Sequence, residues 1–202
     1  MLRVDYLEVP GLPKLSFEVV AGECLAIEGP SGSGKTRLLR AIADLDPVPG
    51  YVHLDGIERA EMPATKWRRL VRYASAEPAW WAATGREHFP ANARIERLLS
   101  ALALDISHLD QPISSLSTGE RQRLGLVRAL SDEPRVLLLD EPTSALDTTS
   151  AAMTEELIRF QLLAGRIVLL VSHDAAQIER LAHARLQLAD TTGRRAPRGE
   201  AA

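Results

Sequence analysis

The stretch ECLAIEGPSGSGKTRLLRAIADL, residues 23–45, joins a short apolar segment to an amphipathic one through a glycine-rich turn. Residues 23–29 have the composition of a buried strand, and residues 36–45 have the apolar spacing of a helix. The turn between them fits the pattern GxxxxGK[ST], which requires a strand before it and a helix after it. The stretch therefore predicts a phosphate-binding loop.

In such a loop, glycines let backbone N–H groups turn towards phosphate oxygens, and the helix N-terminus adds partial positive charge. Lys35 is expected to reach the β- and γ-phosphates of a nucleotide, and the Thr36 hydroxyl is expected to ligate Mg²⁺. The predicted nucleotide-binding residues are Gly29, Pro30, Ser31, Gly32, Ser33, Gly34, Lys35 and Thr36.

Two further apolar segments, residues 135–140 and 166–174, predict buried strands that carry polar side chains at their ends. Asp140 would hold Mg²⁺ beside the phosphate loop, and Glu141 would act as a general base towards water. His173 would hold the γ-phosphate or the attacking water. Taken alone, an acidic pair after a strand is ordinary turn chemistry, and a lone histidine is more often a capping or core residue. The phosphate loop in the same chain favours the functional interpretation.

Apolar strands that alternate with helices predict an α/β fold with a mainly parallel sheet and helices on both faces. We also expect antiparallel strands near the N-terminus. Residues 62–130 carry little strand signal and predict an inserted helical lobe. We expect one domain over residues 1–190 and a disordered tail over 191–202, because the tail lacks apolar residues. In the helix expected over 150–165, the predicted buried stripe contains Met153, Leu157, Phe160 and Ala164.

Composition limits the partners that the chain can be expected to have. Its 202 residues include 24 basic and 27 acidic side chains, so the formal charge of −3 gives no basic surface for nucleic acid. The single cysteine, Cys24, cannot form an internal disulfide, which favours a reducing compartment. No apolar run approaches the about 18 residues of a membrane-spanning helix, and acidic residues interrupt the N-terminus too early for a signal peptide. We expect the chain to reach a membrane only through a partner.

A second glycine-containing turn, LSTGE, opens another predicted helix. Ser117 and Glu120 fit a capping box, and helix initiation alone would explain that pair. Gly119 adds bare backbone beside the Ser117 hydroxyl at the positive end of the helix, which predicts a second anion site. The residues of this turn are Leu116, Ser117, Thr118, Gly119 and Glu120.

Four motifs occur in the order GPSGSGKT, LSTGERQRLGLVRAL, LLLDEPTSALD and VSHD. Together, over roughly residues 2–190, they resemble the ATP-binding cassette (ABC) ATPases. The resemblance implies a P-loop NTPase fold that binds ATP with Mg²⁺ and hydrolyses the γ-phosphoryl group. The turn LSTGE corresponds to the family signature.

In that family two cassettes pair head to tail, and each ATP lies between the phosphate loop of one subunit and the signature of the other. The two turns of this chain would therefore serve two different ATP molecules, with a second ABC subunit completing a homodimer. The resemblance also implies an integral membrane permease as partner, which would place the chain in the cytoplasm at the inner face of the cell membrane. It assigns the D-loop, which crosses the dimer interface, to Ser144, Ala145, Leu146 and Asp147.

The sequence departs from the family pattern in two places. Ala76 stands where the family has a glutamine that contacts Mg²⁺, and the neighbouring Glu77 differs from glutamine in charge and reach. The family also stacks adenine on an aromatic side chain near the position of Val9, whereas Tyr6 lies three residues earlier and is better interpreted as a strand residue.

The adjacent pair Trp80 and Trp81 follows the altered loop. It would either contact a helix of a partner or pack inside the helical lobe. Three other functions stay open at this point: an ABC ATPase that acts on nucleic acid or ribosomes, a nucleotide-gated module with weak hydrolysis, and a P-loop kinase. The kinase gives no role to the turn LSTGE or to LLLDEPTSALD.

Overall fold

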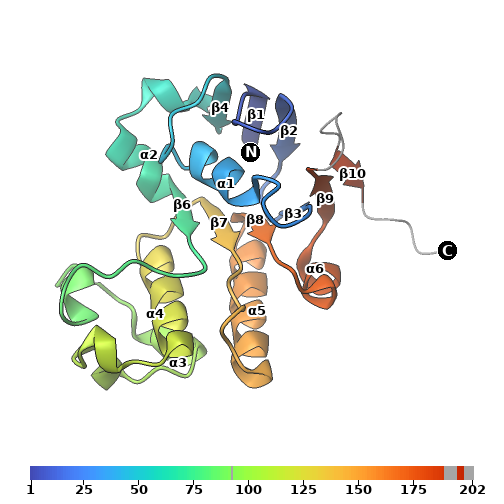
Figure 1. The fold of residues 1–202 in the computed structure, drawn as a ribbon. Helices are drawn as coiled ribbons and strands as arrows, with labels where there is room; N and C mark the ends of the chain where they lie inside the picture. The colour runs from blue at the N-terminus through green and yellow to red at the C-terminus, as the bar shows by residue number, and fades with distance from the viewer. Residues whose placement is uncertain (92, 189–194, 198–202) are drawn as a thin grey trace.

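The computed structural model describes residues 1–91, 93–188 and 195–197, and its strands form two sheets (Figure 1). The smaller sheet is antiparallel and has the strand order β2-β1-β4-β5. Its strands are β1 (Leu2–Leu7), β2 (Leu15–Val19), β4 (Tyr51–Leu54) and β5 (Ile57–Glu58). This sheet confirms the antiparallel strands expected near the N-terminus.

The larger sheet has the strand order β10-β9-β3-β8-β7-β6 and is parallel except for β10, which pairs antiparallel with β9. All five residues of β7 and all five of β8 are buried, because helices cover both faces of the sheet. The strands are β3 (Cys24–Glu28), β6 (Val71–Ala74), β7 (Val136–Asp140), β8 (Ile167–Val171), β9 (Ala184–Gln187) and β10 (Arg195–Pro197).

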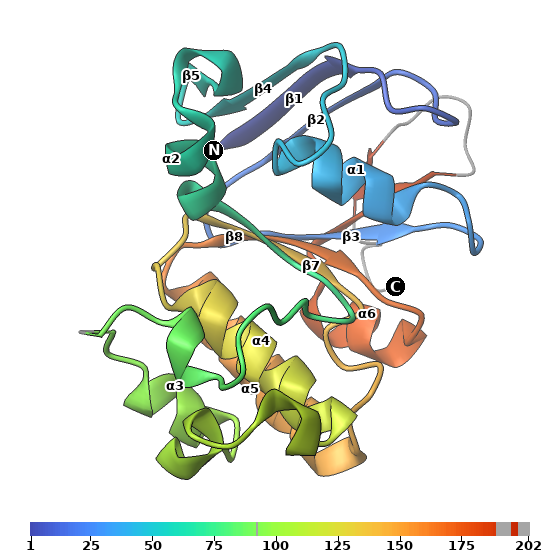
Figure 2. The ribbon, with the colours of Figure 1, turned by 60° about the vertical axis from the view of Figure 1, so that its left-hand side comes forward.

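Helices lie on both faces of the larger sheet, and Figure 2 shows α1 between the two sheets with α4 and α5 against the opposite face. The α-helices are α1 (Lys35–Ile42), α2 (Ala64–Leu70), α3 (Glu96–Ala101), α4 (Thr118–Leu130), α5 (Thr148–Leu163) and α6 (Ala175–Leu181). Short 3₁₀ turns are η1 (Arg59–Glu61), η2 (Arg86–His88), η3 (Ile106–Leu109) and η4 (Ile113–Ser115). Within the described ranges, no helix is both long enough and apolar enough to cross a bilayer.

The two faces of the sheet belong to two large hydrophobic clusters. Leu138 of β7 packs with α1 and the antiparallel strands, whereas its neighbours Leu137 and Leu139 pack with α3, α4 and α5. Burial of alternate side chains on opposite faces explains why β7 reads as a continuous apolar run in the sequence. The helical lobe therefore shares its core with one face of the sheet.

Three local expectations differ from the structure. Strand β6 lies inside the range assigned to the helical lobe, yet it pairs parallel with β7 in the main sheet. In the tail, Arg195–Pro197 form β10 instead of lacking structure, and the rest of 191–202 lies outside the described residues. Phe160 of α5 is 64% exposed, because the buried face of this helix contains Leu157, Ile158 and Leu162 together with polar side chains.

Candidate functional site

The phosphate loop connects the end of β3 to the start of α1, as the sequence predicts. Lys35 is only 7% exposed, and its ammonium group donates to the carbonyl oxygens of Gly29 at 2.7 Å and Pro30 at 3.0 Å. Gly29 has a φ of +154°, and a Cβ atom there would lie 2.8 Å from Ser33 Oγ. The loop thus closes around its own lysine with no space for a larger residue at Gly29.

Thr36 and Asp140, the two predicted Mg²⁺ ligands, are in direct contact. The Thr36 hydroxyl donates to Asp140 Oδ2 at 2.8 Å, and the Tyr73 hydroxyl donates to the same oxygen at 2.9 Å. Among the described residues, no group of three or more His, Cys, Asp or Glu side chains could hold a metal ion. One hydroxyl and one carboxylate suit Mg²⁺, which takes its other ligands from substrate phosphates and water.

Tyr73 was not identified from the sequence as a site residue. Burial, followed by the charge of Asp140, raises the pKa of Tyr73, so its hydroxyl is a stable proton donor to that carboxylate. The only signal in the sequence was a tyrosine in the short segment that became β6, and this segment had not been predicted as a strand.

Glu141 follows β7 and has a left-handed backbone with a φ of +50°. Its Oε2 accepts from the His173 backbone N–H at 3.3 Å, and its Oε1 lies 3.4 Å from His173 Nε2. Burial raises the pKa of the Glu141 carboxyl, although contacts with His173 oppose this effect. A carboxylate with a raised pKa is a better general base than an ordinary glutamate.

Residues 31–37 of the phosphate loop, together with Asp140, Glu141, Val171 and His173, line one cavity of about 250 Å³. The structure therefore brings the predicted loop, the metal ligands and the predicted catalytic pair together. These residues come from the carboxyl ends of β3, β7 and β8, where parallel sheets bind their ligands.

The turn at 116–120 lies outside this cavity. Ser117 Oγ accepts from the Glu120 N–H at 3.2 Å, and Glu120 Oε2 accepts from the Ser117 N–H at 2.7 Å, which confirms the capping box. Leu116 is buried, whereas Thr118 is exposed at the first position of α4. A Cβ atom on Gly119 would lie 3.2 Å from the Ala145 carbonyl oxygen, so the turn contacts the segment 144–147 of its own chain.

That neighbouring segment leads into α5. Ser144 and Ala145 are exposed, Leu146 is half-buried, and Asp147 caps α5 by accepting from the Ser150 N–H at 3.0 Å. The four predicted D-loop residues thus lie beside the turn at 116–120, on the surface of the chain.

Gln122 connects these segments and was also missed by the sequence analysis. It is 4% exposed, and its amide nitrogen donates to the carbonyl oxygens of Glu141 at 2.8 Å and Ala76 at 3.2 Å. It also lies 3.3 Å from Ser144 Oγ, and its amide oxygen accepts from the Ala145 N–H at 3.1 Å. In the sequence, the position of Gln122 on the otherwise apolar face of the predicted helix was the one feature that could have identified it.

The two departures from the family pattern differ in their surroundings. Ala76 is half-buried and contributes its carbonyl oxygen to Gln122, while Glu77 is exposed. Val9 is buried at 2% exposure, and Tyr6 is 68% exposed on the antiparallel sheet. Neither Val9 nor Tyr6 lines the cavity at the phosphate loop.

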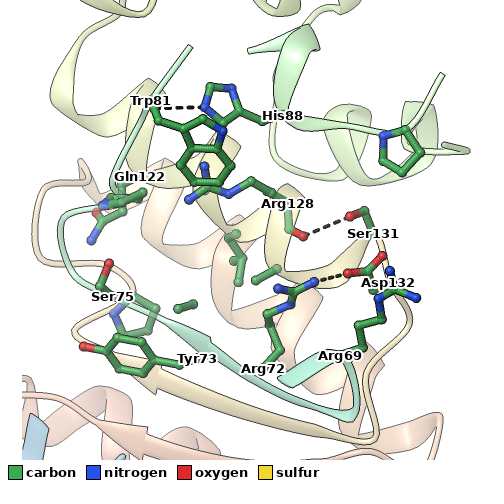
Figure 3. Close-up of a pocket in the computed structure, with 17 residues that line it drawn as sticks. Arg69, Arg72, Tyr73, Ser75, Trp81, His88, Gln122, Arg128, Ser131 and Asp132 are labelled. Atoms are coloured by element: carbon green, nitrogen blue, oxygen red, sulfur yellow. Dashed lines mark hydrogen bonds and ion pairs between the residues drawn. The ribbon is translucent and has the colours of Figure 1, made fainter. Parts of the chain in front are cut away.

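A larger cavity of about 450 Å³ lies between β6, the loop of residues 75–90 and α4 (Figure 3). Trp81 is 74% exposed at this cavity, and His88 contacts the edges of both Trp80 and Trp81. The Arg128 guanidinium lies 4.3 Å from the Trp80 ring centre and 4.9 Å from that of Trp81. Burial, aided by the charge of Arg72, lowers the pKa of Arg128 to about 10. Trp80 therefore packs within the lobe, and Trp81 presents a ring to solvent.

The chain was compared with known proteins. The family described as ABC transporter matches residues 12–144. Protein STAR1 of Oryza sativa subsp. japonica is 38% identical over 83% of this chain and 52% of its own length. The Fe(3+) ions import ATP-binding protein FbpC of Pseudomonas fluorescens is 38% identical over 84% of this chain and 52% of its own length. The chain thus spans about half the length of these curated relatives.

Solved structures of ABC proteins are also similar to this chain. A structure described as the ATP-binding subunit of an ABC transporter superposes with a TM-score of 0.84 and 26% identity, covering 93% of this chain and 85% of the other. A dimeric ATP-binding cassette bound to ADP and Pi gives a TM-score of 0.83 at 24% identity, covering 99% of this chain and 100% of the other, and supports the fold alone. The family match spans the phosphate loop, the turn at 116–120 and the strand end at Asp140.

Proposed function

The chain belongs to the ABC transporter family, and from this premise we propose that it binds ATP with Mg²⁺ and hydrolyses it to power a membrane permease. The observation that carries the proposal is the single cavity that contains the phosphate loop, Asp140, Glu141 and His173. These groups supply anion binding, metal binding and a base within one site.

Each residue has a definite task in this proposal. Lys35 would exchange the carbonyl oxygens of its own loop for the β- and γ-phosphate oxygens. Thr36 and Asp140 would hold Mg²⁺, which neutralises charge on the phosphate oxygens when it is bound. Glu141 would take a proton from the attacking water, and His173, 3.4 Å from that carboxylate, would keep the water in place.

The position of the turn at 116–120 supports a dimer. The turn offers a positive helix end and an exposed Thr118, yet it lies apart from the phosphate-loop cavity of its own chain. In a head-to-tail homodimer it would face the ATP bound by the second subunit. The segment Ser144–Asp147, which contacts this turn, would cross the same interface.

The cavity beside Trp81 supports a permease as the second partner. An aromatic ring that is 74% exposed at a concave surface is suited to a helix of another protein. Two relatives, from Pseudomonas fluorescens and Natronomonas pharaonis, are named import ATP-binding proteins. From a transport role of this kind we infer a membrane permease as the partner of this chain, which would then work in the cytoplasm, peripherally at the inner face of the cell membrane.

The experiment compares the wild-type chain with Glu141→Gln. Wild type should hydrolyse ATP, whereas Glu141→Gln should bind ATP, lose turnover and form a dimer when ATP is added, as measured by light scattering after gel filtration. If the wild-type chain binds no ATP even with its permease, the proposal is wrong. Full turnover by a strictly monomeric preparation would contradict the proposal that each ATP site is made from two subunits.

Ala76 favours one second candidate, a nucleotide-gated module with weak hydrolysis. An alanine offers no polar side-chain atom to Mg²⁺ or to water. If Ala76→Gln raises turnover sharply while ATP affinity stays constant, the weakly hydrolysing module is the better description. Similar turnover of both proteins would support the ATPase.

A further inference from the structure

Tyr73 of β6 lies near both the 450 Å³ cavity and the site at the phosphate loop. The residue borders the 450 Å³ cavity, while its side chain packs on the opposite face of the larger sheet with the hydrophobic cluster that contains Leu138, and Figure 3 shows its hydroxyl pointing away from Arg72. That hydroxyl donates to Asp140 Oδ2 at 2.9 Å. Tyr73 therefore belongs to a strand that borders the partner-facing cavity, and its side chain contacts the predicted metal ligand.

One carboxylate oxygen of Asp140, Oδ2, accepts two hydrogen bonds, one from the phosphate loop and one from β6. Thr36 donates from the phosphate loop at 2.8 Å, and Tyr73 donates from β6. Hydrogen bonds to a buried carboxylate are strong, and a partner of a metal ligand sets the orientation of that ligand. A lone pair of the Thr36 oxygen can still bind Mg²⁺ while the Thr36 O–H donates to Asp140, so the contact from Tyr73 is compatible with metal binding.

The position of Tyr73 in the sheet allows a change at the 450 Å³ cavity to move the Tyr73 side chain. Strand β6 is at the edge of the larger sheet and, among the described strands, pairs with β7 alone, where Tyr73 lies opposite Leu138. The strand ends at Ala74 and continues directly into the loop that frames the cavity. Movement of this loop by an occupant of the cavity would displace the Tyr73 hydroxyl relative to Asp140.

We propose that Tyr73 is a positioning residue that orients Asp140 towards Mg²⁺ and links the 450 Å³ cavity to the metal site. The inference rests on the proposed function, because it assumes that Asp140 holds Mg²⁺ beside ATP. It adds a route by which contact at the cavity changes the affinity of the site for the metal. A purely structural role of the hydroxyl would affect folding and leave metal affinity unchanged.

The first test measures Mn²⁺ binding to the ATP complex of the full chain by electron paramagnetic resonance, in a Glu141→Gln background that prevents turnover. Tyr73→Phe keeps the ring and removes the hydroxyl. We expect it to weaken Mn²⁺ binding about tenfold and to leave ATP affinity in the absence of metal unchanged. The matched control is Tyr51→Phe, because Tyr51 is 53% exposed on the antiparallel sheet, and it should bind Mn²⁺ as the parent does.

The second test asks whether the metal site and the cavity communicate. Adding Mg²⁺ to the ATP complex should change the tryptophan fluorescence of the parent, and loss of that change in Trp81→Phe would assign it to the cavity. Tyr73→Phe should lose most of the change although Trp81 is present. An equal change in Tyr73→Phe and the parent would overturn the link.

A double-mutant cycle separates the proposed role from a folding defect. In an Asp140→Asn background, Tyr73→Phe should cause little further loss of Mn²⁺ affinity, because the contact is already altered. Equal losses in both backgrounds, or Mn²⁺ affinity of Tyr73→Phe within about twofold of the parent, would contradict the proposal. Failure of the proposed function looks different, since the parent itself would then bind neither ATP nor Mn²⁺.

Discussion

The phosphate loop and the turn at 116–120 are both glycine-containing turns that open a helix, but their surroundings differ. The loop encloses the charge of Lys35, which donates to the Gly29 and Pro30 carbonyl oxygens, and it lies beside two carboxylates. The second turn is closed by the reciprocal contacts of Ser117 and Glu120 and by Arg121, which donates to the Leu116 carbonyl oxygen and the Thr118 hydroxyl. The first turn therefore has the features expected of a phosphate-binding loop, whereas the second turn offers mainly a helix end.

The difference shows what a helix N-terminus can and cannot do. Both turns offer partial positive charge and free N–H groups to an anion. The phosphate loop adds a buried lysine and lies beside the predicted metal ligand Asp140 and the predicted base Glu141, whereas the second turn adds the guanidinium of Arg121. We expect changes in the loop to abolish nucleotide binding, and changes in the turn to affect only steps that need a second subunit.

The largest effect is expected from Lys35→Ala. Because this change removes the only full positive charge of residues 29–36, ATP affinity should fall about 100-fold or more, as measured by titration with a fluorescent nucleotide. The control is Lys66→Ala, an exposed lysine of α2, which should bind ATP as wild type does. Similar affinities for Lys35→Ala and wild type would show that the loop is not the phosphate site.

Gly119→Asp should break the second turn alone. Its carboxylate would repel the γ-phosphate of the partner's ATP, so ATP-induced dimerisation and turnover should be lost while the monomer keeps its ATP affinity. Gly119→Ala adds a Cβ 3.2 Å from the Ala145 carbonyl oxygen without a charge, and it should have a smaller effect. Light scattering and nucleotide titration measure the two properties separately.

Mixing the two inactive variants sharpens the comparison. A heterodimer of Lys35→Ala and Gly119→Asp contains one intact site, made from the loop of one chain and the turn of the other. Random pairing in a symmetric dimer should restore about a quarter of wild-type turnover. No recovery on mixing would argue against shared sites.

The sequence predicted the residues of the main site better than the contacts between segments. The phosphate loop, Asp140, Glu141 and His173 were predicted because each lies at or just after the end of a strand, and the ends of parallel strands meet at one edge of a sheet. Tyr73 and Gln122 were missed because their roles depend on partners far away in the chain, at Asp140 and Glu141. Local patterns cannot show such contacts.

The helix α5 illustrates the same limit. Periodicity predicted a buried Phe160, but the side chain is exposed, and the neighbouring Gln161 is 3% exposed instead. Another buried polar side chain, Glu155, pairs with Arg180 of α6. Because polar side chains of α5 pair with other elements, the buried face of the helix differs from the stripe predicted from apolar residues alone.

Gln122→Leu should have an intermediate effect, because it removes the contacts between the turn's helix, Glu141 and Ala145. Leaving these buried backbone groups unpaired should lower the free energy of unfolding by about 1–3 kcal/mol in urea titrations. Misplacement of Glu141 should lower turnover about tenfold. Gln111→Leu, at an exposed position, is the control and should change neither quantity. Unchanged turnover in Gln122→Leu would show that Glu141 is positioned without this contact.

The smallest effect is expected from a change in the contact between α5 and α6. Helix α5 follows the segment 144–147 beside the second turn, and α6 follows His173 of the phosphate-loop cavity. Arg180 donates to Glu155 at 2.6 and 2.7 Å and is the main cause of the lowered pKa of Glu155. A lowered carboxyl pKa stabilises the fold above the unfolded-state pKa of about 4.3, and this contribution is lost as pH falls through the lower folded-state value. Arg180→Gln should therefore lower the melting temperature by a few degrees at neutral pH.

The matched variant is Arg159→Gln, because Arg159 reaches the same carboxylate at the longer distance of 3.5 Å and should matter less. Thermal unfolding of wild type and both variants between neutral and strongly acidic pH tests the assignment. The difference between wild type and Arg180→Gln should disappear at acidic pH, since protonated Glu155 no longer attracts the guanidinium. If the difference in melting temperature between wild type and Arg180→Gln stays constant with pH, Arg180 stabilises α6 by packing. Its charge then contributes nothing to the contact between α5 and α6.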